Sequence, residues 1–232
     1  MIDWHSHILP EIDDGSRSTA ESISLITAQL SQGVKTVVAT PHFDPNFETV
    51  DSFLKRREKS FEKLKEHLPP NAPEIVLGAE VRFYAGISRM EKLKALKAEG
   101  SNILLLEMPM SYWTEYTVRE LIEMSGKSDI KIVLAHVERY FNFQNYETWK
   151  RLYENGILMQ ANASFFTSFQ TKRTAVSLLK HGNIHLIGSD CHNMISRPPK
   201  MDKAFKIIEK KLGKDICEKL NRQGYSLLKE NS

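Results

Sequence analysis

The chain has 232 residues, of which 41% are hydrophobic, so it is long enough for one large α/β domain or two small ones. Its 32 basic and 29 acidic residues give a net charge of +3, which argues against general nucleic-acid binding and membrane adhesion. Two cysteines are too few for a disulfide framework, and no apolar run approaches the roughly 20 residues of a membrane span. The N-terminus carries acidic Asp3 and no signal region. We therefore expect a soluble protein of the cytoplasm.

Short β-rich runs alternate with amphipathic helical segments along the chain. The first strand is predicted at MIDWH, followed by a helix at STAESISLITAQLSQG, where Ser18 and Glu21 have capping-box spacing. The next predicted elements are the strand VKTVVAT, the helix VDSFLKRREKSFEKLKEHL, the strand EIVLGAE, a helix from about 87 to 98, the strand NILLLE and a helix from about 114 to 125. The strand IKIVLAH, a helix around 146–154, the strand GILMQANA, a helix around 171–181 and the strand IHLIGSD follow. Two charged helices close the chain from about residue 199.

This alternation predicts parallel strands joined by right-handed helical crossovers. Most of the seven predicted strands are continuous apolar runs, the pattern of strands buried on both faces. No Gly/Ser/Pro-rich linker interrupts the alternation, so we expect residues 1–232 to form one domain. Periodicity does not separate an open sheet from a closed barrel. The absence of a glycine-rich phosphate-binding fingerprint removes the commonest reason to prefer the open sheet.

Residues able to bind a metal stand at the carboxyl ends of six of the seven predicted strands. In parallel α/β folds these ends meet at one edge, so residues distant in sequence converge there. In strand order they are His5 and His7, His42, Glu80, Glu107, His136, and Asp190 with His192, and Asp14 in the loop after the first strand can join them.

Taken singly, each of these residues has an ordinary structural explanation, such as a salt bridge or a hydrogen bond to a backbone carbonyl. Together they would be costly without cations, because buried carboxylates lose hydration and like charges repel. Nitrogen and oxygen ligands without a thiolate fit manganese, iron or catalytic zinc, and nine ligands suit two or three ions. Clustered divalent ions indicate hydrolysis, since a bound water drops in pKa from about 16 to about 7.

Two arginines follow these ligands closely and indicate a phosphorylated substrate. Arg139 lies three residues after His136, and Arg197 lies five after His192. A guanidinium binds phosphate bidentately and stays charged, although pairing with loop carboxylates is an alternative. Aromatic residues in the same loops are candidates for holding a planar substrate, with packing as the alternative: Phe43, Phe47, Tyr84, Tyr112, Trp113, Tyr140 and Phe141.

The segments DWHSH, TPHFD, GAE, LLLEMP, LAHVERY and IGSDCHNMISRPP resemble those of the polymerase and histidinol phosphatase (PHP) superfamily. Within it, the chain is most similar to the manganese-dependent protein-tyrosine phosphatases encoded with bacterial capsule and exopolysaccharide genes. The resemblance extends to about Pro199 and implies a distorted seven-stranded (β/α)7 TIM-like barrel. It implies one ion held by His5, His7, Glu80 and Asp190, a second by Glu80, Glu107 and His136, and a third by Asp14, His42 and His192.

The implied reaction is attack of a metal-bound hydroxide on phosphotyrosine, with Arg139 and Arg197 contacting the phosphate and His42 or a water supplying a proton. The resemblance also implies that the substrate is the tail of a bacterial tyrosine kinase that controls polysaccharide export. One rival is a histidinol-phosphate or other small-molecule phosphatase with the same ions. A rival of another class is a non-catalytic module that docks on a kinase. The sequence leaves the oligomeric state open.

Overall fold

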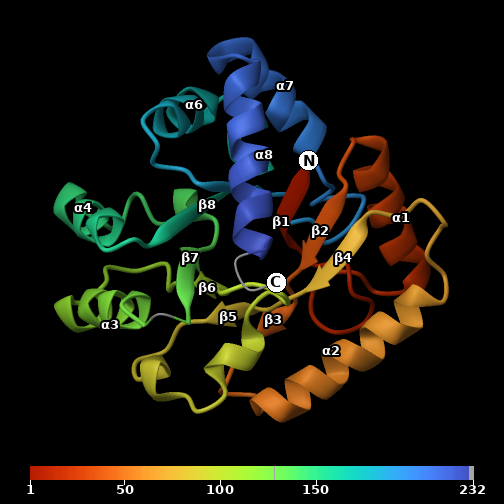
Figure 1. Cartoon of the computed structure of the whole chain (residues 1–232), viewed down its shortest axis with the longest axis horizontal. Helices are drawn as coiled ribbons and strands as arrows, with labels where there is room; N and C mark the ends of the chain where they lie inside the picture. Colours follow the sequence, from red (N-terminus) through yellow and green to blue (C-terminus); the bar gives the residue numbers. More distant parts are fainter. Residues whose placement is uncertain (128, 230–232) are drawn as a thin grey trace.

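The computed structural model describes residues 1–127 and 129–229 as parallel strands interleaved with helices (Figure 1). The strands are β1 (Ile2–Ser6), β2 (Thr36–Ala39), β3 (His42–Phe43), β4 (Glu74–Leu77), β5 (Glu80–Arg82), β6 (Ile103–Glu107), β7 (Lys131–Leu134), β8 (Leu158–Asn162) and β9 (Leu186–Gly188). The α-helices are α1 (Thr19–Ser31), α2 (Val50–Lys65), α3 (Glu115–Ser125), α4 (Tyr146–Glu154), α5 (Ala163–Thr167), α6 (Lys172–Lys180), α7 (Met201–Leu212) and α8 (Lys214–Lys229). Three short 3₁₀ helices are η1 (Ile87–Arg89), η2 (Leu93–Leu96) and η3 (Val137–Arg139).

The strands form two parallel sheets that together curve into a half-barrel. One sheet has the order β1-β2-β4, and the other has the order β3-β5-β6-β7-β8-β9. The described strand pairs are all parallel, as the alternation of strands and helices predicts. Residues at the carboxyl ends of these strands therefore gather at one edge of the fold.

Breaks follow or divide two of the predicted strands. The second predicted strand ends at Thr40 and forms β2, and β3 begins after Pro41, which has no N–H to donate to a neighbouring strand. The third divides into β4 and β5 at Gly78–Ala79. His42 consequently lies in the two-residue strand β3, which pairs with β5 and places His42 beside Glu80. The interruption moves His42 into the second sheet, where most of the cluster residues lie.

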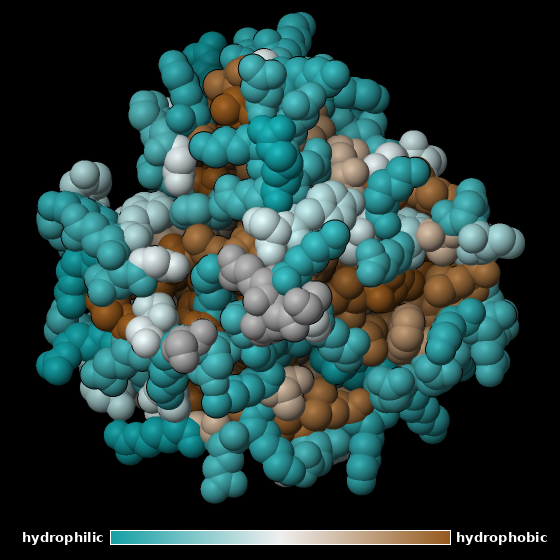
Figure 2. All heavy atoms as spheres, viewed as in Figure 1, coloured by the Kyte–Doolittle hydropathy of each residue, from teal (hydrophilic) through white to brown (hydrophobic). Residues whose placement is uncertain are grey.

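Helix α1 begins as the capping box predicts. The Ser18 hydroxyl accepts a hydrogen bond from the Glu21 N–H at 3.2 Å, while the Glu21 carboxylate accepts from the Arg17 N–H at 2.8 Å. Its buried residues include Leu25 and Ile26, which join the main hydrophobic core. Figure 2 shows hydrophilic side chains over the outer helices of this face, with hydrophobic residues between them.

The helix predicted from about 87 to 98 is wrong, because the segment forms η1 and η2 instead. The buried carboxylate of Glu120, on α3, accepts hydrogen bonds from the backbone N–H groups of Gly86 and Ser88, each at 3.0 Å. Gly86 also adopts a left-handed conformation at φ 97°. This contact from a distant helix holds a tight turn in place of a continuous α-helix.

The two charged C-terminal helices form as predicted, and α8 covers the amino ends of the strands. In Figure 1 it runs down to the centre of the molecule beside β1. The Tyr225 hydroxyl donates to the Met1 carbonyl at 3.5 Å, and a methyl group added at Gly224 would lie 2.7 Å from Ile2. The carboxyl ends of the strands are left to the loops that carry the metal-binding candidates.

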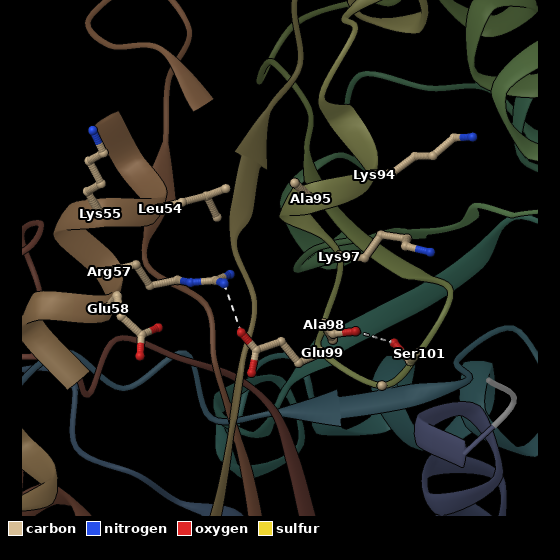
Figure 3. A pocket seen from close by; sticks show the side chains of 11 residues that line it. Leu54, Lys55, Arg57, Glu58, Lys94, Ala95, Lys97, Ala98, Glu99 and Ser101 are labelled. Carbon is tan, nitrogen blue, oxygen red and sulfur yellow. Dashed lines mark hydrogen bonds and ion pairs between the residues drawn. The ribbon is translucent and has the colours of Figure 1, made fainter. Parts of the chain in front are cut away.

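Arg57, on α2, is a buried cation that reaches the break between β4 and β5. Its guanidinium donates to the Gly78 carbonyl and to the Glu99 carboxylate, each at 3.0 Å, beside a cavity of about 630 Å³ (Figure 3). Arg57→Ala removes the donor to the Gly78 carbonyl, and a buried acceptor that loses its partner costs about 1–3 kcal/mol. We expect the free energy of unfolding in urea to fall by that amount.

Lys55→Ala provides the control, because Lys55 lines the same cavity but is exposed. An exposed substitution of this kind changes stability by no more than about 0.5 kcal/mol. Equal stability of the Arg57→Ala and Lys55→Ala proteins would show that the buried guanidinium does not support the strand break.

Candidate metal centre

The nine metal-binding candidates converge at the carboxyl edge of the strands, as expected from the sequence. Glu80 lies at the middle, with its Oε2 atom 3.0 Å from His5 Nε2 and 3.2 Å from His7 Nε2. Asp190 Oδ1 lies 3.7 Å from His5 Nε2 and 3.5 Å from His7 Nε2. These four side chains come from β1, from the residue after it, from β5 and from the segment after β9, and their polar atoms converge.

The other oxygen atom of Glu80 faces a second group. His136 Nε2 lies 2.8 Å from Glu80 Oε1 and 3.6 Å from Glu107 Oε1. His42 Nδ1 lies 3.2 Å from Glu80 Oε2, so His42 also approaches this group. Glu80 thus touches imidazoles on both sides, the position that a bridging ligand requires.

A third group surrounds Asp14. Its Oδ1 atom lies 3.4 Å from His42 Nε2 and 3.3 Å from His192 Nε2. Three sets of potential ligand atoms each fall within 4.8 Å: His7, Asp14, His42 and His192; His5, His7 and Asp190; and His42, Glu80 and Glu107. His42 therefore links the second and third groups.

The donor set fits divalent metal ions. It consists of imidazole nitrogens and carboxylate oxygens, most of them deeply buried, with Glu80 only 1% exposed. The buried His192 Nε2 has no hydrogen-bond partner among the described residues, although it faces Asp14. A buried nitrogen that faces other ligand atoms without a hydrogen bond is available to a metal ion. These observations fit the residues to two or three ions.

The charges of the central group depend on one another. Burial opposes charge on each member, but the imidazoles hold the pKa of Glu80 well below its usual value. In return, despite burial, the Glu80 and Asp190 carboxylates raise the pKa of His5, and Asp13 and Glu80 raise the pKa of His7. The carboxylates are thus stabilised by positive neighbours, a role that bound cations fill equally well.

At Glu107 and His192, by contrast, the pKa shifts favour the neutral form of the side chain. Burial and the nearby Glu80 carboxylate raise the pKa of Glu107 to about 7. Burial, followed by the charge of His7, lowers the pKa of His192 to about 4, so that this imidazole is neutral at physiological pH. A neutral imidazole has the free lone pair that metal coordination requires.

Three further side chains, which were not predicted for this role, orient the histidines. His7 Nδ1 donates to Asp13 Oδ2 at 2.7 Å, and His5 Nδ1 donates to the Gln160 carbonyl oxygen at 3.1 Å, which leaves both Nε2 atoms facing the cluster. The Tyr140 hydroxyl lies 3.1 Å from His136 Nδ1. Such partners fix the ring orientation of metal-binding histidines. Of these partners, only Asp13 could have been suspected from the sequence, because it is adjacent to the candidate ligand Asp14.

Two of the nine residues have left-handed backbones, at φ 33° for His136 and φ 52° for Asp190. Residues other than glycine adopt this conformation rarely, and the surrounding structure must compensate for its cost of about 1–3 kcal/mol. At Asp190 the backbone N–H donates to the His5 carbonyl at 2.7 Å, which joins the end of β9 to β1. The strained backbone conformations therefore occur at two of the residues that are candidates to bind metal.

Arg139 and Arg197 both lie at the cluster, on either oxygen of Asp190. Arg139 Nη2 is 2.5 Å from Asp190 Oδ2, and Arg197 Nη2 is 2.6 Å from Asp190 Oδ1. The two side chains are about one-third exposed, so their guanidinium groups also reach solvent. The pairing with a carboxylate is the alternative considered from the sequence, and it holds both cations beside the metal-binding residues.

The seven aromatic candidates differ in burial, and two of them, Tyr84 and Phe141, are partly buried against the core. Phe43, Trp113 and Tyr140 are buried in the core, so packing, the alternative drawn from the sequence, accounts for them. Phe47 and Tyr112 are exposed, at 85% and 79% of their surface. The three buried rings therefore pack in the core, whereas Phe47 and Tyr112 face solvent.

Cys191 is fully buried. Burial raises the pKa of its thiol, which disfavours the thiolate that a nucleophile requires. Its sulfur contacts Gln29 Nε2 at 3.6 Å. The site therefore offers ligands for metal ions rather than a cysteine nucleophile.

A family model described as "Capsular polysaccharide synthesis, CpsB/CapC" matches residues 1–227 of the chain. The chain is 34% identical to the tyrosine-protein phosphatase CpsB of Streptococcus pneumoniae, across 95% of this chain and 94% of that protein. It is 27% identical to the tyrosine-protein phosphatase YwqE of Bacillus subtilis, across 100% and 93%.

Among solved structures, a chain from the study of YwqE from B. subtilis and CpsB from S. pneumoniae, described as unique metal-dependent tyrosine phosphatases, superposes with a TM-score of 0.86 at 25% identity. The alignment covers 100% of this chain and 96% of that one. The family model spans every strand end that carries a metal-binding candidate. The chain belongs to the CpsB/CapC family of capsular polysaccharide synthesis proteins.

Proposed function

We propose that this protein is a metal-dependent protein-tyrosine phosphatase. The observation that carries the proposal is the buried cluster of nine metal-binding residues with two arginines beside it, in a chain whose relatives are named tyrosine-protein phosphatases. A docking module would have no use for such a cluster, because burying its carboxylates without cations is costly.

The proposed ligand sets follow the three groups of contacts. One ion would be held by His5, His7, Glu80 and Asp190, a second by Glu80, Glu107 and His136, and a third by Asp14, His42 and His192. We favour manganese, with iron or zinc as alternatives, because the ligands are nitrogen and oxygen without sulfur. When bound, such ions lower the pKa of water at the site and offset negative charge on a phosphoryl group.

The chain's own cations bind the phosphoryl group in this proposal. Arg139 and Arg197 carry planar pairs of N–H donors that match phosphoryl oxygens. His42, whose side chain is 35% exposed, or a water molecule delivers a proton to the leaving oxygen. A phenol has a pKa near 10, so the phenolate leaves with little need for a strong acid.

The proposal also covers the domain count, the closure of the barrel, the cellular location and the substrate protein. We infer one domain and a closed, distorted (β/α)7 barrel, supported by the backbone hydrogen bonds from Asp190 N–H to His5 O and from His7 N–H to Cys191 O that join β9 to β1. We further propose a cytoplasmic enzyme that acts on the phosphorylated tail of a tyrosine kinase in polysaccharide export. Within the described residues, no helix has the length and apolarity needed to span a bilayer.

Metal reconstitution tests the activity. Protein stripped with a chelator should release no phosphate from a phosphotyrosine peptide, and manganese added in excess over the chelator should restore turnover. Activity that persists in protein shown by elemental analysis to hold no metal would overturn the proposal.

A second substrate separates this proposal from its rival in the small-molecule class. The chain shares the fold of a histidinol phosphate phosphatase from Lactococcus lactis, with a TM-score of 0.58 at 14% identity, covering 91% of this chain and 93% of that one. Preference of the manganese-loaded protein for histidinol phosphate over the phosphotyrosine peptide would favour the rival.

A further inference from the structure

A cavity of about 520 Å³ opens beside the metal-binding cluster. Three of the nine cluster residues line it, namely Asp14, His42 and Glu107. The loop between β3 and α2 forms another part of its wall through Phe47, and β5 contributes Arg82. The cavity therefore connects the proposed phosphoryl site with a set of residues to which the proposed reaction assigns no role.

Phe47 is notable because 85% of its surface is exposed on an otherwise well-anchored loop. Before it, the Asp44 carboxylate accepts hydrogen bonds from the Asn46 N–H at 2.9 Å and from Arg82 at 3.0 Å. After it, the Glu48 carboxylate pairs with Arg56, whose guanidinium also donates to the Ile12 carbonyl at 2.9 Å. The loop is held on both sides of Phe47, so the ring is presented to solvent at a defined place.

The remaining wall of the cavity cannot bind an extra cation strongly. Asp44 and Glu48 already pair with Arg82 and Arg56, and Asp13 pairs with His7. The features left to bind a substrate are the Phe47 ring and the planar guanidinium of Arg82, both of which stack against aromatic rings. An aromatic group next to the phosphoryl site matches this wall.

We propose that Phe47 is a specificity-determining residue that contacts the phenyl ring of phosphotyrosine while the phosphoryl group lies at the cluster. The inference rests on the proposed phosphatase function and extends it to the choice of aryl over alkyl phosphate esters. The ring fits beside Phe47 in the 520 Å³ cavity, with room left for neighbouring peptide atoms.

The test compares Phe47→Ala with the wild-type protein, both loaded with manganese. Aromatic pairs contribute enough that loss of the ring should lower kcat/KM for a phosphotyrosine peptide by roughly 3- to 10-fold. Inhibition by inorganic phosphate, which has no ring, should keep the same inhibition constant. Phe47→Trp should restore most of the lost kcat/KM.

Phe169→Ala is the matched control, because Phe169 is 86% exposed but does not line this cavity. It should leave both measurements unchanged. If Phe47→Ala has no effect, or weakens phosphate inhibition as much as peptide turnover, the inference is overturned and the proposed function stands. If the metal-loaded wild type does not turn over phosphotyrosine at all, the proposed function fails and takes the inference with it.

Discussion

Glu80→Gln is expected to lower phosphotyrosine turnover by more than about 100-fold, beyond the usual cost of losing a residue that only orients a metal ligand. The two Glu80 oxygens lie within 3.2 Å of four imidazoles, those of His5, His7, His42 and His136. Glutamine has nearly the same shape but carries no charge, and its NH₂ group cannot coordinate a metal ion. Elemental analysis after manganese loading should show that the variant retains fewer ions than the wild type.

Glu120→Gln controls for the general effect of changing a buried carboxylate. Glu120 is 3% exposed and accepts hydrogen bonds from the backbone N–H groups of Gly86 and Ser88, neither of which belongs to the nine cluster residues. The variant should lose stability and keep its manganese. Full metal content and turnover in Glu80→Gln would contradict the bridging role.

Gly188→Ala is expected to cost both stability and metal binding. A Cβ atom at the end of β9 would lie 2.4 Å from His5 Cβ and 2.8 Å from the His5 backbone nitrogen. These atoms belong to strand β1 and cannot rotate away, so the strands must separate. Overpacking of this kind costs about 1–3 kcal/mol, and displacement of His5 should weaken metal binding by about 10- to 100-fold. Urea denaturation of the metal-free protein and manganese titration measure the two effects separately.

Gly126→Ala is the matched control, since a Cβ atom there would find its nearest neighbour at 3.6 Å. Gly126 has φ −71°, which alanine adopts without strain. This variant should unfold at the same urea concentration as the wild type and bind manganese normally. Equal behaviour of the two alanine variants would mean that the contact between β9 and β1 tolerates expansion.

Local patterns determined much of the fold in advance. The capping box at Ser18 and Glu21 predicted the start of α1, and the apolar runs predicted the parallel strands, because both depend on residues adjacent in the chain. Pro41 also indicates the break between β2 and β3, and the predicted strand ends just before it, at Thr40. The failed helix at 87–98 had no such signal, since Glu120 comes from another element.

The sequence by itself determined which residues gather at the site, because parallel strands carry their carboxyl ends to one edge. Only the tertiary structure decided how those residues are oriented. Gln160 lies 155 positions from His5 in the chain, and Gly188 approaches His5 where β9 meets β1. These partners contact His5 at distances of a few ångströms, although they belong to segments remote from it in the chain. No local pattern records those distances, so only the fold reveals which side chains hold the histidines in place.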